Sequence, residues 1–267
     1  MNTKNLRIGI IGTGNMGSAI IKGIASGTRK YNIMVHDIDK TQLSSIQNEK
    51  GVNIADSIAE ITDFSDMLIL AVKPDIVVKI ASTLNNYQGI IISIAAGISI
   101  NTLKNSAGHE KKIVRAMPNT PVNTGYGMTV ISPSDNIPAD EIEEVKSIFT
   151  SVGKVLIMDE KHMNAVTAIS GSGPAYIFTL IQAMADAGVK LGIPRSESLL
   201  LAGQTILGSA KMFLDKNENP IMLRDKVTSP GGTTIAALHI LEKAGFNGII
   251  IDAIEAAAKR SKELDKP

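Results

Sequence analysis

Short apolar runs alternate with helical patterns from the start of the chain to Met158. The runs are rich in Ile, Leu and Val and have the length of strands, and they lie at Ile8–Ile11, Asn32–His36, Met67–Leu70, Ile90–Ser93, Ile113–Arg115, Tyr126–Ile131 and Lys154–Met158. Helical spacing marks the intervening segments Met16–Ala25, Thr41–Gln47, Ile58–Ile61, Asp75–Leu84 and Ala139–Phe149. The first five runs, apolar and alternating with helices, predict a parallel sheet with helices on both faces, and the last two look like further strands.

The pattern changes after Met158, where no segment alternates with a period of two. Helical spacing dominates instead, at Asn164–Ser170, Ala175–Leu191, Glu197–Leu214 and Ile249–Lys262. We therefore expect an α/β protein with an N-terminal Rossmann-type doubly wound sheet in residues 1–158 and an all-helical C-terminal domain in residues 159–267. Met163–Ala185 contains no Asp, Glu, Lys or Arg, but Gly171–Pro174 would break a membrane-spanning helix, which favours a buried core or subunit-interface helix.

Composition narrows the classes of function. The 267 residues carry 27 basic and 26 acidic side chains, and only 3% are aromatic, so nucleic acid is not an expected partner. The absence of cysteine excludes disulfides, thiolate metal sites and cysteine nucleophiles. The four histidines form no metal-ligand spacing, so no metal is expected. The short polar stretch Met1–Arg7 does not read as a signal peptide, and we expect a soluble cytoplasmic protein without membrane contact.

A glycine-rich turn follows the first predicted strand and opens a helix. Its residues are Gly12-Thr13-Gly14-Asn15-Met16-Gly17. In a GxGxxG turn the first glycine permits the tight bend, the second lets the backbone approach a pyrophosphate, and the third allows the helix to pack closely on the sheet. The free N–H groups of the following helix would then bind the phosphates, which predicts a dinucleotide site.

An acidic residue, Asp37, stands at the end of the second predicted strand, twenty residues beyond Gly17. An acid at this position binds the ribose 2′-hydroxyl of NAD and repels the 2′-phosphate of NADP. Asp37 could equally cap a helix or stabilise a turn. The choice between NAD and NADP therefore stays open.

Three further segments leave predicted strands at the same edge of the sheet, where open α/β sheets bind ligands. They are Ala71-Val72-Lys73-Pro74, Ser93-Ile94-Ala95-Ala96-Gly97 and Met117-Pro118-Asn119-Thr120-Pro121. Lys73 could contact a phosphate or ribose or be an ordinary solvated lysine. The small residues Ala95, Ala96 and Gly97 would let the backbone pass close to a nicotinamide. Asn119 could orient a ligand, or could simply belong to a stiff loop between prolines.

A second glycine-rich segment, Ser229-Pro230-Gly231-Gly232-Thr233-Thr234, precedes the apolar helix pattern Ile235–Lys243. Glycines, hydroxyls and a helix start suit a carboxylate or phosphate. The alternative is a helix cap with Thr233 or Thr234 as the N-cap residue. Without a base, metal or nucleophile in view, hydride transfer from a cofactor is the chemistry that fits best.

Seven segments together resemble the pyrroline-5-carboxylate reductase family. They are Ile8–Ile20, Ala71–Pro74, Ser93–Gly97, Met117–Pro121, Ser170–Tyr176, Gly188–Pro194 and Val227–Glu242, and they cover essentially the whole chain. The resemblance implies reduction of L-1-pyrroline-5-carboxylate to L-proline, the last step of proline biosynthesis, with NADPH or NADH as donor. It also implies a homodimer formed through the helical domain, and assembly of such dimers into decamers.

The resemblance also implies roles for individual residues. Gly12–Gly17 and Ala71–Pro74 match cofactor-binding segments. Gly231, Gly232 and Thr233 match the cradle of the substrate carboxylate, and Thr234 matches the hydroxyl that hydrogen-bonds the ring nitrogen. Glu160 occupies a position that contacts the imino acid in some members, and Ser172 and Asn119 are further expected substrate contacts. Two departures are Asp37, where NADP-preferring members have small polar or basic residues, and Lys226, where some relatives have Asn.

Two alternatives remain at this point. One is another two-domain Rossmann oxidoreductase such as a β-hydroxyacid dehydrogenase, but the first lysine after Gly171-Ser172-Gly173 is Lys190, at the far end of its helix, and this fits poorly. The other is a non-catalytic paralogue that binds dinucleotide as a sensor. The intact segment from Ser229 to Thr234 argues against a sensor.

Overall fold

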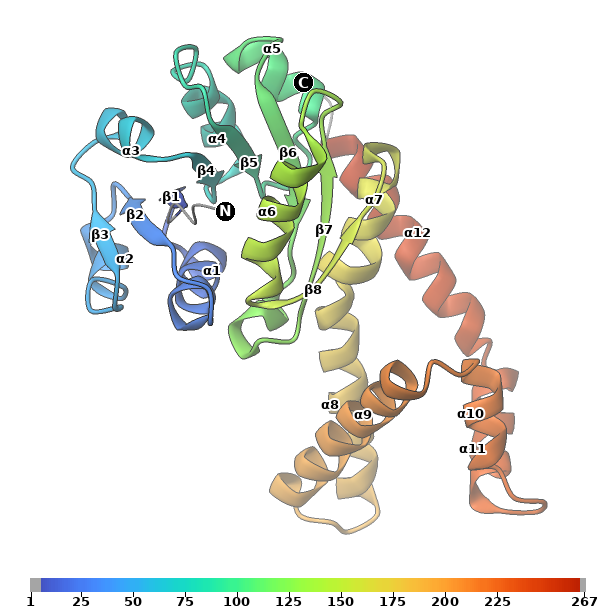
Figure 1. Ribbon diagram of the computed structural model, residues 1–267. Coiled ribbons are helices and arrows are strands. Elements are labelled where there is room, and N and C mark those ends of the chain that lie inside the picture. The colour runs from blue at the N-terminus through green and yellow to red at the C-terminus, as the bar shows by residue number, and fades with distance from the viewer. Residues whose placement is uncertain (1–5, 265–267) are drawn as a thin grey trace. The chain divides into compact units, whose positions relative to one another are not determined.

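A single mixed sheet organises the first part of the chain. The structure is a computed structural model in which residues 6–264 are described. Within that range the strands are β1 (Arg7–Ile11), β2 (Asn32–His36), β3 (Val52–Ile54), β4 (Met67–Leu70), β5 (Ile90–Ser93), β6 (Lys112–Met117), β7 (Gly127–Pro133) and β8 (Gly153–Ile157). Their order across the sheet is β3-β2-β1-β4-β5-β6-β7-β8 (Figure 1). The order reverses between β1 and β4, as in a doubly wound sheet, which confirms the predicted fold class.

Helices cover both faces of the sheet. One hydrophobic cluster joins α1 (Asn15–Ser26) and α6 (Ala139–Thr150) to the sheet, and a second joins α3 (Ile58–Phe64), α4 (Pro74–Ala81) and α5 (Ile100–Ala107) to the opposite face. Alternation along the strands separates the two clusters: Ile8 and Ile10 belong to the first and Ile11 to the second. The short helix α2 (Lys40–Ser44) follows β2.

One strand runs against the others. β7 pairs antiparallel with β6, whereas the remaining neighbours, including β7 and β8, pair in parallel. The sequence predicted a parallel sheet from the first five runs and two further strands without a direction, and the structure assigns the antiparallel direction to β7. Only the 3₁₀ turn η1 (Thr120–Thr124) connects β6 to β7. A connection this short suits an antiparallel pair, because a parallel crossover needs a dozen or more residues.

The chain is helical from Glu160 onward, as predicted. The elements are η2 (Glu160–His162), α7 (Met163–Val166), η3 (Thr167–Gly171), α8 (Gly173–Lys190), α9 (Arg195–Lys216), α10 (Pro220–Lys226), α11 (Thr233–Lys243) and α12 (Phe246–Leu264). Gly171–Pro174, the segment expected to break a helix, interrupts it only at Ser172, because η3 is a π turn and Pro174 falls in the first turn of α8, where proline is tolerated.

The described residues pack into two compact units. Unit 1 contains the chain through Ser172 together with the segment from Ala256 onward, and unit 2 contains Gly173–Glu255. The change from sheet to helix falls between Ile157 and Glu160, but η2, α7 and η3 still pack with the sheet. The division into domains at residue 158 stays a prediction.

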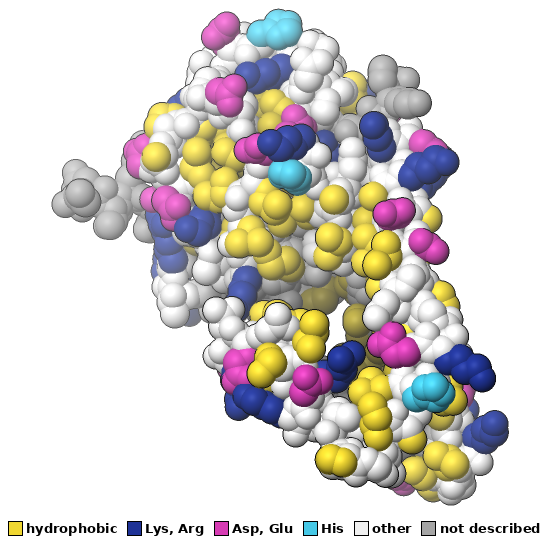
Figure 2. Space-filling model, turned by 90° about the vertical axis from the view of Figure 1, so that its right-hand side faces the viewer, with side chains coloured by type: hydrophobic (Ala, Val, Ile, Leu, Met, Phe, Trp, Pro, Cys, Tyr) yellow, Lys and Arg dark blue, Asp and Glu magenta, His cyan; other side chains and the backbone are white. Residues whose placement is uncertain are grey.

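Unit 2 has little core of its own. Its buried residues are Ala185, Ser198, Ala202 and Leu223, and three of the four are small. Large apolar side chains are exposed on its helices instead, among them Phe178, Leu200, Leu207, Phe213, Ile240 and Ile251. Figure 2 shows hydrophobic side chains among charged ones on the displayed face of this unit. Exposed apolar surface on this scale marks an interaction surface.

No single helix in the described range is both long and apolar enough to cross a membrane. Only α11 and α12, taken together as a pair bent by 51°, have the required length and composition.

Candidate active site

The glycine-rich turn has the geometry that a dinucleotide requires. Gly12 has a φ of +99°, and a Cβ there would lie 2.4 Å from the carbonyl oxygen of Ala71. A Cβ on Gly17 would lie 2.1 Å from the carbonyl oxygen of Gly12. Both glycines are therefore fixed by packing within the protein.

Gly14 is different, because a Cβ there would meet no protein atom within 4 Å. Gly14 is also the N-cap residue of α1, where no side chain caps the helix and the first turn holds no acid. The open space beside Gly14 and the free N–H groups of α1 fit a bound pyrophosphate. This end of the sheet therefore fits the dinucleotide that the sequence predicted. Asn15 is exposed and Met16 is half-buried against the core, and their contact with the dinucleotide stays a prediction.

The Asp37 carboxylate is bound to the glycine-rich turn. Its Oδ2 accepts hydrogen bonds from the Thr13 main-chain N–H at 2.7 Å and from the Thr13 hydroxyl at 3.0 Å. Its Oδ1 accepts from the Asp39 N–H at 2.9 Å. Asp37 thus stabilises a turn, as one of its predicted roles required, and it does not cap α2, whose N-cap residue is Asp39. These hydrogen bonds also hold Asp37 beside the glycine-rich turn, next to the place that a bound ribose would occupy.

The segment Ala71–Pro74 meets the turn at the same sheet edge. The Ala71 N–H donates to the Ile11 carbonyl at 2.8 Å, which places Ala71 and the half-buried Val72 beside Gly12. Lys73 is exposed and is the N-cap residue of α4, whose first residue is Pro74. The N–H groups at the start of α4 have no side-chain cap, and they lie at the same edge of the sheet as those of α1.

The segment after β5 is closely packed. Ala95 is buried and Ala96 half-buried, and Gly97 has a φ of +72°. A Cβ on Gly97 would lie 3.1 Å from the Cβ of Leu264, near the end of α12. The backbone of this segment is therefore held in place by the last helix of the chain.

Asn119 and Glu160 use their polar atoms within unit 1. Asn119 accepts from the Met128 N–H at 2.8 Å and donates to the Ser170 carbonyl at 3.0 Å. Glu160 Oε1 accepts from the Ile100 N–H at 2.7 Å and from Arg115 Nη1 at 3.2 Å. Both residues tie strands to the start of the helical region, and their contact with substrate stays a prediction.

Arg115 was not identified from the sequence. Its side chain is only 4% exposed and stands between the apolar residues Val114 and Ala116 of strand β6. A buried arginine requires partners, and a charge within an apolar run was the signal available. Ser172, which ends the first segment of unit 1, donates its N–H to the Thr167 carbonyl at 2.8 Å, and its substrate contact stays a prediction.

The remaining predicted substrate residues lie on unit 2, at the start of α11. Gly232 is the N-cap residue, and no side chain caps the helix. The alternative in which Thr233 or Thr234 is the N-cap was therefore wrong, because both lie inside the helix. Within residues 6–264 neither threonine hydroxyl has a hydrogen-bond partner, so both are available to a ligand.

A hollow of about 660 Å³ lies beside this helix start. Gly231 and Gly232 line it together with Arg224, His239 and Glu242. Arg224 Nη1 lies 3.7 Å from Glu242 Oε1. The first turn of α11 contains no acid, so its N–H groups present positive charge to an anion without a competing carboxylate.

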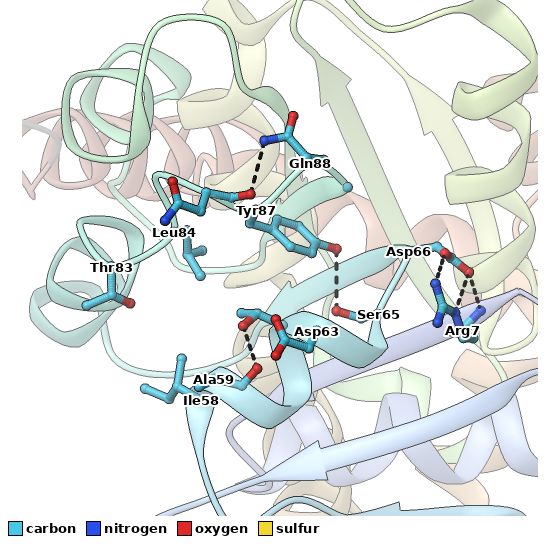
Figure 3. A pocket seen from close by; sticks show the side chains of 13 residues that line it. Arg7, Ile58, Ala59, Asp63, Ser65, Asp66, Thr83, Leu84, Tyr87 and Gln88 are labelled. Carbon is cyan, nitrogen blue, oxygen red and sulfur yellow. Dashed lines mark hydrogen bonds and ion pairs between the residues drawn. The ribbon is translucent and has the colours of Figure 1, made fainter.

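Another hollow, of about 800 Å³, lies at the opposite edge of the sheet (Figure 3). It is lined by the ion pair of Arg7 and Asp66, which are 2.7 Å apart, and by Tyr87, whose hydroxyl accepts from Ser65 at 3.4 Å. These residues stand at the amino ends of β1, β4 and β5. Ligands of open α/β sheets bind at the carboxyl ends, so this hollow is separate from the dinucleotide site.

Comparison with known proteins gives consistent results for both parts of the chain. Residues 160–264 match the family described as "Pyrroline-5-carboxylate reductase dimerisation", and residues 7–97 match "NADP oxidoreductase coenzyme F420-dependent". The pyrroline-5-carboxylate reductase of Escherichia coli (strain K12) is 40% identical over 265 residues, which cover 97% of this chain and 98% of the relative. That of Arabidopsis thaliana is 40% identical over 268 residues, covering 98% of this chain and 97% of the relative.

Solved structures extend the likeness to the fold. A pyrroline-5-carboxylate reductase from Coxiella burnetii has a TM-score of 0.93 at 34% identity and covers all of both chains. The pyrroline carboxylate reductase of Plasmodium falciparum, solved with NADP bound, has a TM-score of 0.87 at 36% identity and covers 98% of this chain and 99% of its own. A prephenate dehydrogenase from A. aeolicus, at 17% identity and a TM-score of 0.54, shares the fold alone.

Proposed function

This chain belongs to the pyrroline-5-carboxylate reductase family, and from that membership we propose that it reduces L-1-pyrroline-5-carboxylate to L-proline with NAD(P)H. The reaction adds a hydride to the carbon of the ring C=N bond and a proton to its nitrogen, and it is the last step of proline biosynthesis. The chain is thus an oxidoreductase that acts on a cyclic imine. Its likeness to other two-domain Rossmann proteins is limited to the fold, and a non-catalytic sensor is not favoured.

The start of α11 is the single observation that carries the assignment of the substrate site. Its N–H groups are uncapped, its first turn lacks acids, and the hydroxyls of Thr233 and Thr234 are unpartnered within residues 6–264. The main-chain N–H groups of Gly231, Gly232 and Thr233 would bind the substrate carboxylate. The hydroxyl of Thr234 would then bind the ring nitrogen.

The residues of unit 1 would position the donor. Gly12–Gly17 and Ala71–Pro74 would bind the dinucleotide phosphates and ribose, and Ala95–Gly97 would border the nicotinamide. Bound NAD(P)H supplies the hydride, so the protein itself needs no nucleophile. Correct placement of the imine carbon, together with charge stabilisation at the nitrogen, would account for much of the rate. Glu160, Ser172 and Asn119 complete the proposed substrate contacts.

The helical region is a dimerisation domain, and the chain forms a homo-oligomer through it. The exposed apolar side chains of unit 2 support this, since they would be buried against a second copy. We further propose that residues 1–158 and 159–267 are the two domains, that dimers assemble into decamers, and that the enzyme is cytoplasmic. Neither nucleic acid nor membrane is part of the proposal.

One assay tests the reaction. Oxidation of NADH and of NADPH is measured with pyrroline-5-carboxylate as the substrate. Separately, reduction of NAD and of NADP is measured with 3-hydroxyacids as the substrates. Turnover with pyrroline-5-carboxylate and formation of proline support the proposal. Turnover with 3-hydroxyacids alone would assign the other two-domain class, and cofactor binding without any turnover would assign a sensor.

A further inference from the structure

We propose that Asp37, held in place by Thr13, makes this enzyme select NADH over NADPH. The inference rests on the proposed function in that it takes a nicotinamide dinucleotide as the cofactor, and it names which of the two the site accepts.

The carboxylate of Asp37 is fixed by the turn that would hold the cofactor. Thr13, the second residue of the glycine-rich turn, is completely buried, and it donates both its N–H and its hydroxyl to Asp37 Oδ2. The preceding N–H, that of Gly12, donates to the His36 carbonyl at 2.9 Å. Consecutive hydrogen bonds therefore bind the end of β2 to the turn, and the carboxylate cannot rotate away without breaking two of them.

The number of lone pairs on Asp37 leaves room for one further donor. An ionised carboxylate offers about four acceptor positions. Thr13 uses two on Oδ2, and the Asp39 N–H uses one on Oδ1. The free position on Oδ1 suits a hydroxyl such as the ribose 2′-OH of NADH. A 2′-phosphate near neutral pH has little proton to donate and carries a charge of the same sign.

The surrounding charges do not compensate for Asp37. Asp39 is the next acid, and hydrogen bonds from Thr41, chiefly from its hydroxyl, hold the pKa of Asp39 below its ordinary value. His36 donates its Nδ1–H to the Ala55 carbonyl at 3.0 Å, so this nitrogen is not available to a phosphate. Lys40 is the one cation between His36 and Thr41, which leaves this segment at a net charge of −1.

Direct binding measurements test this selection without relying on turnover. Isothermal titration calorimetry of the purified oligomer with NADH and with NADPH gives the two Kd values. We expect NADH to bind at least about tenfold more tightly, the ratio for a doubly charged phosphate about 5 Å from a carboxylate in water. Equal affinities, or tighter binding of NADPH, would overturn the proposal, and this comparison needs no variant to fold.

Matched variants assign the selection to Asp37. Asp37→Asn removes the charge while keeping an oxygen for Thr13, and it should lower the NADH preference at least about fivefold, mainly by tightening NADPH. Asp39→Asn removes the same charge from an exposed neighbour and should change the preference less than about twofold. Equal effects of the two variants, or an unchanged ratio in Asp37→Asn, would refute the role of Asp37.

Thr13 is a positioning residue in this proposal, and its test needs a conservative rescue. Thr13→Val should weaken NADH binding and lower the preference for NADH over NADPH, because the Asp37 carboxylate loses the hydrogen bond from the Thr13 hydroxyl. Thr13→Ser should restore both the affinity and the preference. A serine variant that behaves like the valine variant would contradict the role of the hydroxyl.

The outcomes also separate this inference from the proposed reaction. Selective NADH binding without reduction of pyrroline-5-carboxylate would refute the reaction and leave the selection standing. Reduction of pyrroline-5-carboxylate with a preference for NADPH would support the reaction and refute the selection of NADH.

Discussion

Glu160 Oε1 lies 2.7 Å from the main-chain nitrogen of Ile100, the first residue of α5. The same oxygen accepts from the buried Arg115. One carboxylate thus joins β6, the start of α5 and the start of the helical region. Because Ile100 follows the segment Ser93–Gly97 closely, the position of the predicted nicotinamide border depends on this contact.

Replacing Glu160 should therefore affect folding as well as activity. Glu160→Ala removes an acceptor from both Ile100 and Arg115, and we expect it to lower the free energy of unfolding by about 1–3 kcal/mol. Glu160→Gln keeps an acceptor for Ile100 and should lose less. Urea unfolding measures the free energy of unfolding of both variants. Equal stability of the parent and the two variants would show that the contact does not support the fold.

Gly12 and Gly14 should respond differently to alanine. Gly12→Ala places a Cβ against the Ala71 carbonyl at a positive φ, and we expect the free energy of unfolding to fall by more than about 2 kcal/mol. Gly14→Ala meets no protein atom, so stability should stay within about 1 kcal/mol while cofactor affinity falls about tenfold or more. Thermal unfolding and calorimetric titration separate the two effects. Unaltered cofactor binding in Gly14→Ala would mean that no phosphate lies there.

Thr234→Ala should slow the reaction and leave the fold intact. A hydrogen bond to a charged nitrogen contributes about 1.5–3 kcal/mol, so we expect kcat/KM to fall about ten- to hundredfold. Steady-state kinetics measure this, with Thr234→Ser as the rescue and Thr150→Ala, an exposed threonine on α6, as the control. Parent-like kinetics in Thr234→Ala would remove the hydroxyl from the proposed mechanism.

Stability at high pH should depend on Tyr87. Burial raises the pKa of the Tyr87 phenol above its ordinary value of 10.0. The unfolded chain therefore gives up this proton from about pH 10 while the folded chain retains it, so stability falls as the pH rises, by about 1.4 kcal/mol per pH unit for this one group. Tyr87→Phe should remove that part of the slope in urea unfolding across this range. Tyr126→Phe, at a position that is 78% exposed, should not.

The oligomer should depend on apolar side chains of unit 2. Leu200 on α9 is 70% exposed and has no role in the core of its own chain. Leu200→Lys would place a charge in the proposed subunit interface and should shift the protein toward monomers in analytical ultracentrifugation. Ile54→Lys, on the edge strand β3, is the control and should keep the parent's mass. A parent-like mass for Leu200→Lys would place the interface elsewhere on the unit.

The regular apolar strands and long helices could be predicted from the sequence, but the marginal elements could not. β3 has three residues, two of them exposed, so it leaves no apolar run. α5 begins at a Ser99 cap and buries only Ile100, Leu103 and Ala107 among polar residues. β3 forms because it pairs with β2, and α5 forms because it packs on the sheet, so their local sequence alone gives little signal.

The candidate site divides in the same way. Glycines and hydroxyls at strand ends could be located from the sequence, because local geometry requires those residue types. The pairing of Thr13 with Asp37, 24 residues apart, and of Arg115 with Glu160, 45 apart, follows from tertiary packing. The threonine cap on α11 was one open alternative, because glycine and threonine both serve as N-caps and the sequence did not decide between Gly232 and its successors.

Leu264, in the last turn of α12, packs on Gly97, and Ser261 of the same helix donates to Asn164 at 2.8 Å. The ribosome makes the last part of α12, from Ala256, only after all of unit 2, yet this part packs with the cofactor half of the molecule. A nascent chain that carries every strand of the sheet would still lack the helix that holds the Gly97 segment. We therefore expect cofactor binding to arise late in synthesis, after the dimerising helices have emerged, so that subunit pairing and cofactor capture compete for the same interval.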